Sequence, residues 1–196
     1  MNTLMKKLAP KATGMIRLDH THVLSTFHQY HADTKPATKQ ALVKTICLAL
    51  EIHAQIEEEI FYPAMREVAE RDSAAVDKSL PEHNEMKRLI GVLRGMAPTD
   101  TAYDSTVLEL MRDVMHHVAD EETTLLPDAE RLLGEEELQE LGARMTRRRI
   151  ELAAPRSGEF AANMARAVPA GKMLAVTGAV VAGTLIARRA FAARPR

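Results

Sequence analysis

The stretch HAQIEEEIFYP, residues 53–63, occurs a second time in altered form as HVADEETTLLP, residues 117–127. Both copies read His-x-x-x-Glu-Glu, continue into two large side chains, and reach a proline ten positions after the histidine. The offset between the copies is 64 residues. Self-similarity at a fixed offset indicates that one structural unit occurs twice. The chain is therefore predicted to contain two related halves.

An acid–histidine pair precedes each copy of this motif. The pairs are Asp19-His20 and Glu82-His83, which are offset by 63 residues. Each half thus contains an acid–histidine pair, a gap of 33 or 34 residues, and then a His-x-x-x-Glu motif. One such half arises easily by chance, but two halves in register do not. The pattern therefore indicates a shared chemical site.

The spacing within each motif places an imidazole and a carboxylate on one face of a helix, because residues four apart lie one turn apart. With the histidine of each acid–histidine pair, the set has four imidazoles and two carboxylates. Two glutamates buried among apolar residues are costly unless positive charge compensates them. Nitrogen and oxygen donors from facing helices suit a pair of iron or manganese ions better than calcium or magnesium. The predicted metal ligands are His20, His53, Glu57, His83, His117 and Glu121.

Helical periodicity and helix-breaking clusters predict four long helices and a shorter, more polar one. Pro63 is expected to kink the second helix, and Ser79 with Glu82 resembles a capping box at the start of the third. Short loops between the helices predict an all-α fold, an antiparallel up-down-up-down four-helix bundle with additional C-terminal helices. The expected helices span residues 14–32, 37–69, 72 or 81 to 95, 102 to beyond 127, and 135–152.

Composition agrees with a helical protein and excludes several other classes. Only 4% of the 196 residues are aromatic, which argues against an all-β sandwich. The single cysteine, Cys47, excludes an intramolecular disulfide and a zinc site made of several thiolates. No apolar run of signal-peptide length follows the basic N-terminal residues, so we expect a reducing, cytoplasmic setting.

Charge divides the chain unevenly. Residues 1–140 contain 15 Lys and Arg against 25 Asp and Glu, whereas residues 141–196 contain 11 against 2. Such asymmetry is typical of a globular body joined to an arm with a different partner. The acidic body lacks the basic face that nucleic-acid binding needs, so no nucleic-acid partner is expected. The predicted organisation is a flexible N-terminus at 1–13, the bundle at 14–133, a short polar helix and linker at 134–155, and a basic tail with an apolar Ala/Gly-rich helix at 156–196.

The tail contains an uncharged stretch, MLAVTGAVVAGTLIA, at residues 173–187. As a helix, this stretch would extend about 22 Å, less than the roughly 30 Å hydrocarbon core of a membrane. Basic flanks nevertheless favour a membrane anchor, and small residues at four-residue spacing favour pairing with another copy. Three interpretations stay open: an anchor that tethers the protein to a membrane, a self-association helix, and an unstructured Ala-rich tail.

With these motifs established, the sequence resembles the hemerythrin-like, or HHE cation-binding, family over about residues 14–133. The resemblance implies a bundle that holds two non-haem iron ions, with the four histidines as terminal ligands and the two glutamates as bridges; manganese and zinc stay open as alternatives. It also implies binding or sensing of oxygen, of nitric oxide or peroxide, or of iron. An enzyme that reduces peroxide or nitric oxide and a regulatory module that reports metal or redox state are the alternatives. The residues that match the family are His20, His53 with Glu57, His83, and His117 with Glu121.

Two positions depart from the oxygen-carrying members of this family. Their fifth histidine, four residues after the third-helix histidine, is Lys87 here. A missing imidazole leaves an open position, a water or a substitute ligand, for which His31, eleven positions after the first-helix histidine, is a candidate. The carriers also place the last carboxylate five positions after its histidine, which would select Glu122. The repeat favours Glu121, because it aligns with Glu57.

Other polar residues near the motifs have simpler interpretations. Three further histidines, His22, His28 and His116, are expected to play no part in metal binding. Cys47 is expected to be a core residue. Three further glutamates are expected to form an acidic cluster that is solvated or lies behind the ligands; they are Glu58, Glu59 and Glu122.

Overall fold

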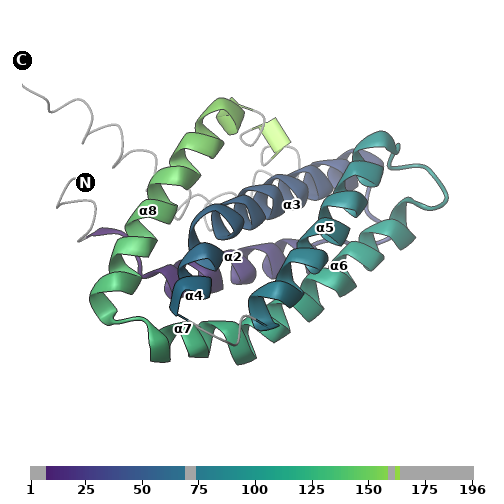
Figure 1. The fold of residues 1–196 in the computed structure, drawn as a ribbon. Coiled ribbons are helices and arrows are strands. Elements are labelled where there is room, and N and C mark those ends of the chain that lie inside the picture. The colour runs from purple at the N-terminus through teal and green to yellow at the C-terminus, as the bar shows by residue number, and fades with distance from the viewer. Residues whose placement is uncertain (1–7, 69–73, 159–161, 164–196) are drawn as a thin grey trace, which may run out of the picture.

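The computed structural model describes residues 8–68, 74–158 and 162–163, and all regular secondary structure in these ranges is helical. Helix α2 packs against α3, and α5 packs against α6, with short loops at 28–35 and 96–102 inside each pair (Figure 1). The predicted all-α helical bundle is confirmed. The four bundle helices are α2 (Ala12–Phe27), α3 (Pro36–Ile56), α5 (Ala74–Gly95) and α6 (Tyr103–Asp120).

Both copies of the repeated motif interrupt their helix in the same way. After α3, the chain forms the π-helical segment η1 (Glu57–Phe61) and then α4 (Tyr62–Val68). After α6, it forms the π-helical segment η2 (Glu121–Leu125) and then α7 (Leu126–Leu132). Each π segment ends two residues before a proline, which has no N–H to donate and whose ring clashes with the preceding turn. The predicted kink at Pro63 is thus a widened turn that begins at the first glutamate of the motif.

A further helix, α8 (Glu135–Ala153), lies outside the four-helix arrangement and leads into the 3-10 segment η3 (Ala154–Arg156). It packs against α2, α3 and η1 (Figure 1). Its apolar face places Leu138, Leu141 and Met145 in the core, since residues three or four apart form one stripe on a helix. Helix α8 therefore covers the end of the bundle at which α2 begins.

Two apolar clusters fill the bundle, and a layer of polar residues separates them. On α2, Ile16 belongs to the cluster next to α8, and Val23 belongs to the cluster at the other end. His20 is buried between these two positions, and His53 interrupts the apolar face of α3 in the same way. Because both clusters exclude water, the polar layer between them lies in a dry interior.

Helix α2 ends earlier than predicted. It stops at Phe27 rather than near residue 32, and residues 28–34 form turns. The amides of Gln29 and Tyr30 bond to carbonyls three residues back, which is the tightened pattern of a helix end. As a result, His31 does not continue the helical face on which His20 lies.

Helix α5 begins close to Asp72, the earlier of its two predicted starts, and not at Pro81. It starts at Ala74 and contains Pro81 in its interior. Ser79 is therefore a buried helical residue, and its predicted capping role is wrong. Asp72, the other predicted start, lies outside the described residues.

Among the residues that the structure describes, no helix is long and apolar enough to cross a membrane. The uncharged stretch at 173–187 and most of the predicted N-terminal segment lie outside those residues. The three interpretations of the tail therefore stay predictions.

Substitution of Gly142 tests the close approach between α8 and the segment that precedes α2. A Cβ at Gly142 would lie 2.0 Å from the Pro10 carbonyl oxygen, so Gly142→Ala must displace one of the two segments. We expect the free energy of unfolding to fall by about 1–3 kcal/mol.

The matched control is Gly91→Ala in α5, where no atom lies within 4 Å of the added Cβ. Helix propensity alone predicts that this variant gains about 0.5–1 kcal/mol. Urea unfolding measures both changes. A Gly142→Ala variant as stable as the wild type would contradict the close packing of α8.

Candidate metal centre

Six polar side chains meet in the layer between the two apolar clusters. Each bundle helix contributes one histidine, and each π segment contributes the glutamate with which it begins. None of the six residues is more than 3% exposed. The structure thus brings together all six residues that the repeat selected as candidates. They are His20 on α2, His53 on α3, His83 on α5, His117 on α6, Glu57 in η1 and Glu121 in η2.

Each glutamate lies between two imidazoles. Glu57 Oε2 is 3.1 Å from His53 Nε2 and 3.4 Å from His83 Nε2. Glu121 Oε2 is 3.3 Å from His20 Nε2 and 3.6 Å from the Nε2 of the histidine four residues before it. All four imidazoles therefore turn Nε2 toward the carboxylates, as a common metal site requires.

Two overlapping sets of these side chains are compact enough to hold a metal ion each. Within each set, one ligand atom per residue lies within 4.8 Å of all the others. The two sets share His53 and His117, so they adjoin each other in the layer. One set consists of His20, His53, His117 and Glu121, and the other consists of His53, Glu57, His83 and His117.

Several inward-facing atoms have no hydrogen-bond partner among the described residues. They include His20 Nε2, His53 Nε2, Glu57 Oε1 and Glu121 Oε2. A buried polar atom without a partner costs about 1–3 kcal/mol, and native proteins contain few of them. Metal ions bound by these nitrogens and oxygens would satisfy the atoms at once. The donor set therefore fits a pair of transition-metal ions.

The charge states of the cluster also favour cations. Burial lowers the pKa of His53 to about 4, so its imidazole is neutral at neutral pH, which is the form that binds metals. Burial, and after it the charge of Glu121, raises the pKa of Glu57 well above its usual value. The two carboxylates thus resist ionising together in the protein alone. Divalent cations between them would remove that resistance.

The second glutamate of each motif lies behind a histidine of the opposite half. Glu58 Oε1 is 2.9 Å from His83 Nδ1, and Glu122 Oε1 is 2.9 Å from His20 Nδ1. Both glutamates therefore lie behind candidate ligands. This agrees with one of the two predictions for them, the other being a solvated surface cluster. The structure places Glu121, and not Glu122, inside the cluster.

The acid of each acid–histidine pair lies behind the other histidine of the same half. Glu82 Oε2 is 3.0 Å from His117 Nδ1, and Asp19 Oδ2 is 3.6 Å from His53 Nδ1. Burial by itself raises the pKa of Asp19, but the contact with His53 and the charge of Arg149 outweigh burial and lower it. A carboxylate behind Nδ1 orients the ring and directs Nε2 to a metal. The sequence did not predict this role for the two acids, although their place directly before each histidine was a usable signal.

Comparison with known proteins agrees with this geometry. Residues 11–129 match the family model of the hemerythrin HHE cation binding domain. The chain belongs to this family. A crystal structure of a hemerythrin HHE cation binding domain-containing protein from Mycobacterium kansasii has a similar fold, with a TM-score of 0.63 and 20% identity over 81% of this chain and 99% of that chain. A DNA nickase from Nostoc sp. is 33% identical over 112 residues, which are 57% of this chain and 31% of the nickase, so the chain spans about a third of that relative.

Tyr62, which was not predicted as a site residue, also lies inside the cluster of six side chains. The Tyr62 side chain is buried, and its hydroxyl is 2.8 Å from Glu121 Oε1 and 3.2 Å from His83 Nε2. Burial raises the pKa of Tyr62, so the phenol keeps its proton and donates it in a hydrogen bond to Glu121. Tyr62 directly precedes the proline of the first motif, where the second motif has Leu126. This difference between the two copies was the signal that could have found it.

Lys87, at the position where the oxygen carriers have a fifth histidine, forms an ion pair with Glu58 outside the cluster. Lys87 Nζ lies 2.6 and 2.7 Å from the two carboxylate oxygens of Glu58. It therefore adds positive charge behind an outer carboxylate and provides no metal donor. His31, the candidate substitute, is exposed in the turn after α2 and does not reach the cluster. The remaining histidines also lie outside both donor sets: His22, His28 and His116.

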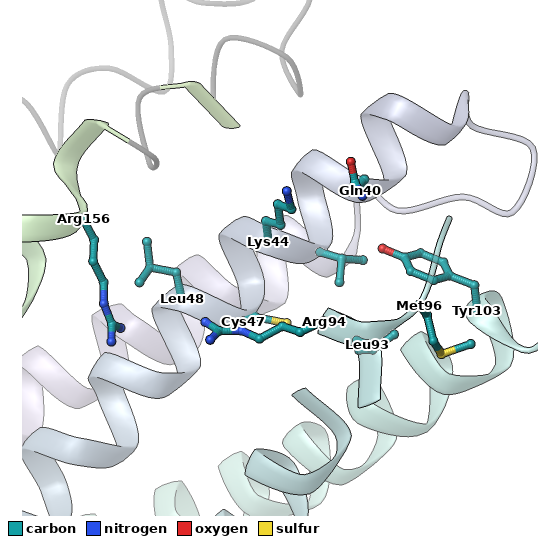
Figure 2. A pocket seen from close by; sticks show the side chains of 10 residues that line it. Gln40, Lys44, Cys47, Leu48, Leu93, Arg94, Met96, Tyr103 and Arg156 are labelled. Carbon is teal, nitrogen blue, oxygen red and sulfur yellow. The ribbon is translucent and has the colours of Figure 1, made fainter. Parts of the chain in front are cut away.

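Two cavities differ in their relation to the cluster. A cavity of about 310 Å³ opens beside Cys47 between α3 and the end of α5, and none of the six cluster residues lines it (Figure 2). Burial raises the pKa of Cys47 to about 12, which agrees with a core role. A smaller cavity of about 80 Å³ is lined by Ser79, Asp120 and Glu121 among others, so it lies beside the cluster, although the Glu121 side chain itself is fully buried.

Removal of an outer carboxylate should weaken metal binding without removing a ligand. We expect Glu82→Ala to weaken binding of ferrous iron about 10–100-fold, because His117 loses the partner of its Nδ1. The matched control on the same helix is Glu85→Ala, since Glu85 pairs with Arg88 at the surface. Anaerobic competition against a chelator measures both affinities. Equal affinities in the two variants would contradict the role given to Glu82.

Proposed function

We propose that this hemerythrin HHE protein holds two iron ions in the buried cluster and uses them to bind or sense oxygen, a related small molecule such as nitric oxide or peroxide, or iron itself. The observation that carries the proposal is the pair of overlapping donor sets with unpartnered atoms. The four histidines would be terminal ligands, and Glu57 and Glu121 would be bridges. Bound iron would supply reversible redox chemistry and a place for a small ligand.

The size of the cavity beside the cluster supports a small ligand. Its volume is about 80 Å³, and a single water needs about 10–15 Å³ of such space. The cavity thus admits a few molecules of the size of water. Pockets for organic ligands usually measure about 300–1,000 Å³. The proposal therefore favours a diatomic molecule or peroxide over turnover of an organic substrate.

Two side chains, Lys87 and Tyr62, would leave room for that ligand and hold Glu121, a proposed bridge, in place. Lys87 pairs with Glu58 and so leaves free the coordination position that a fifth imidazole would take. Tyr62 donates a hydrogen bond to Glu121 and thereby restricts the orientation of this carboxylate. The Glu121 carboxylate is thus held by the neutral Tyr62 hydroxyl, which does not cancel the negative charge that would attract metal ions.

We do not extend the proposal to DNA on the basis of the similarity to a DNA nickase. The matched segment is 31% of that protein. In the present chain, residues 1–140 contain 25 acidic against 15 basic side chains, and such a surface repels the phosphate backbone. We propose that the matched segment supplies metal binding and that the bundle has no nucleic-acid partner.

Metal analysis of the purified full chain tests the proposal. We expect two irons per chain, together with the absorption bands of a coupled diiron pair. His117→Ala should lose most of the metal, because His117 belongs to both donor sets. The matched control is His116→Ala, which changes the exposed neighbouring histidine and should keep both irons. Full metal content in His117→Ala would refute the site, and zinc in place of iron would remove the oxygen chemistry.

A second candidate is an enzyme that reduces peroxide or nitric oxide at the same site. The observation that favours it is the cavity beside Glu121, since turnover requires access from the surface. Consumption of hydrogen peroxide and of nitric oxide by the iron-loaded chain under steady-state conditions separates the candidates. Under the leading proposal, we expect rates close to those of free iron at equal concentration. Rates far above that level would establish the enzyme.

A further inference from the structure

Helix α8 lies beyond residues 11–129, the range of the family match, yet it packs on the elements that carry the metal cluster (Figure 1). Leu141 and Met145 of α8 belong to the apolar cluster next to the start of α2. Gly142 allows the close approach to Pro10 described above. Apolar packing therefore docks α8, and its polar contacts act in addition.

Two consecutive arginines of α8 pair with carboxylates that adjoin the candidate ligands. Arg149 Nη2 donates a hydrogen bond to Asp19 Oδ2, and the same oxygen faces His53 Nδ1 at 3.6 Å. Arg148 Nε is 2.6 Å from Glu59 Oε2, and Arg148 Nη2 is 3.0 Å from Glu59 Oε1. Each arginine thus connects α8 to a carboxylate of a different bundle element.

The contact with Arg149 restricts how Asp19 can turn. The Asp19 carboxylate lies between a guanidinium on α8 and an imidazole on α3. Its side chain is only 16% exposed, so this ion pair is screened by salt less than a surface pair. Without Arg149, the carboxylate would be free to turn toward solvent. Its oxygen lies just beyond hydrogen-bond distance of His53 Nδ1, so an immobile Asp19 orients the His53 ring through their charge interaction and keeps Nε2 toward the cluster.

The contact with Arg148 restricts the π segment. Glu59 lies in η1, two residues after Glu57, and its carboxylate accepts two hydrogen bonds from the planar Arg148 guanidinium. Glu58, between them, holds the ring of His83. Docking of α8 therefore limits the motion of the segment that carries one candidate bridge and one outer carboxylate.

We infer that α8 is part of the metal-binding unit: Arg149 positions Asp19, and through it His53, while Arg148 steadies η1. The inference rests on the proposed binding of metal at this cluster. Coupling between two binding equilibria is reciprocal, so docking of α8 that favours metal binding is favoured by metal to the same extent. Metal occupancy therefore sets how firmly α8 is held on the bundle.

Four single variants at three adjacent arginines in the full chain test the first half of this coupling. We expect Arg149→Gln to weaken binding of ferrous iron about tenfold, at the lower end of effects seen for residues behind a metal ligand, and Arg148→Gln to weaken it less. Arg147→Gln is the matched control, because Arg147 is exposed and pairs with Glu151 within α8, and it should leave the affinity unchanged. Arg149→Lys, which keeps the charge but not the planar fork, should recover part of the loss.

Amide hydrogen exchange in α8, with and without ferrous iron, tests the reverse direction. Exchange in the wild type should slow when iron is bound. This difference should shrink in Arg149→Gln and persist in Arg147→Gln. A purely structural role for Arg149 would change exchange equally in both states and leave the iron-dependent difference intact.

The outcomes separate this inference from the proposed function. A wild-type chain that binds no metal would overturn the proposed function and the inference together. A wild-type chain that binds two irons, with equal affinity in Arg149→Gln and Arg147→Gln, would overturn the inference alone. Exchange in α8 that does not respond to iron would also overturn it.

Discussion

Two buried carboxylates constrain the rest of this structure. Glu57 and Glu121 are almost completely removed from water, and a carboxylate in such a place requires either a proton or nearby positive charge. Apolar clusters above and below keep water from the four imidazoles around them, which are the candidate metal donors. The π segments contribute by widening the helix at the residue where each carboxylate enters the layer.

The two halves of the chain complete each other at this layer. Glu58 of the first half orients His83 of the second, and Glu122 of the second half orients His20 of the first. Neither half therefore contains a full set of oriented donors. Inside the cluster the two motifs differ at Tyr62, which has an aliphatic counterpart in the second motif and gives one glutamate a hydrogen-bond donor.

Part of the basic C-terminal region pairs with the acidic bundle. Three arginines among the described residues of 141–196 contact bundle carboxylates, and a different partner for the rest of the basic tail stays a prediction. The attraction between the two parts supplements the apolar docking of α8, and it brings positive charge to the outer side of the metal layer. The pairs are Arg148 with Glu59, Arg149 with Asp19, and Arg156 with Glu51.

The sequence by itself determined the helical class, the repeat and the six side chains of the candidate centre, because spacing along one helix decides which residues lie on the same face. Only the tertiary structure decided where α2 ends, that Tyr62 enters the cluster, and which carboxylate lies behind which imidazole. The contacts of Tyr62 and of the outer carboxylates join residues 21 to 102 positions apart, as in Tyr62 with His83 and Glu122 with His20. They depend on how the helices pack, and no local spacing records that packing.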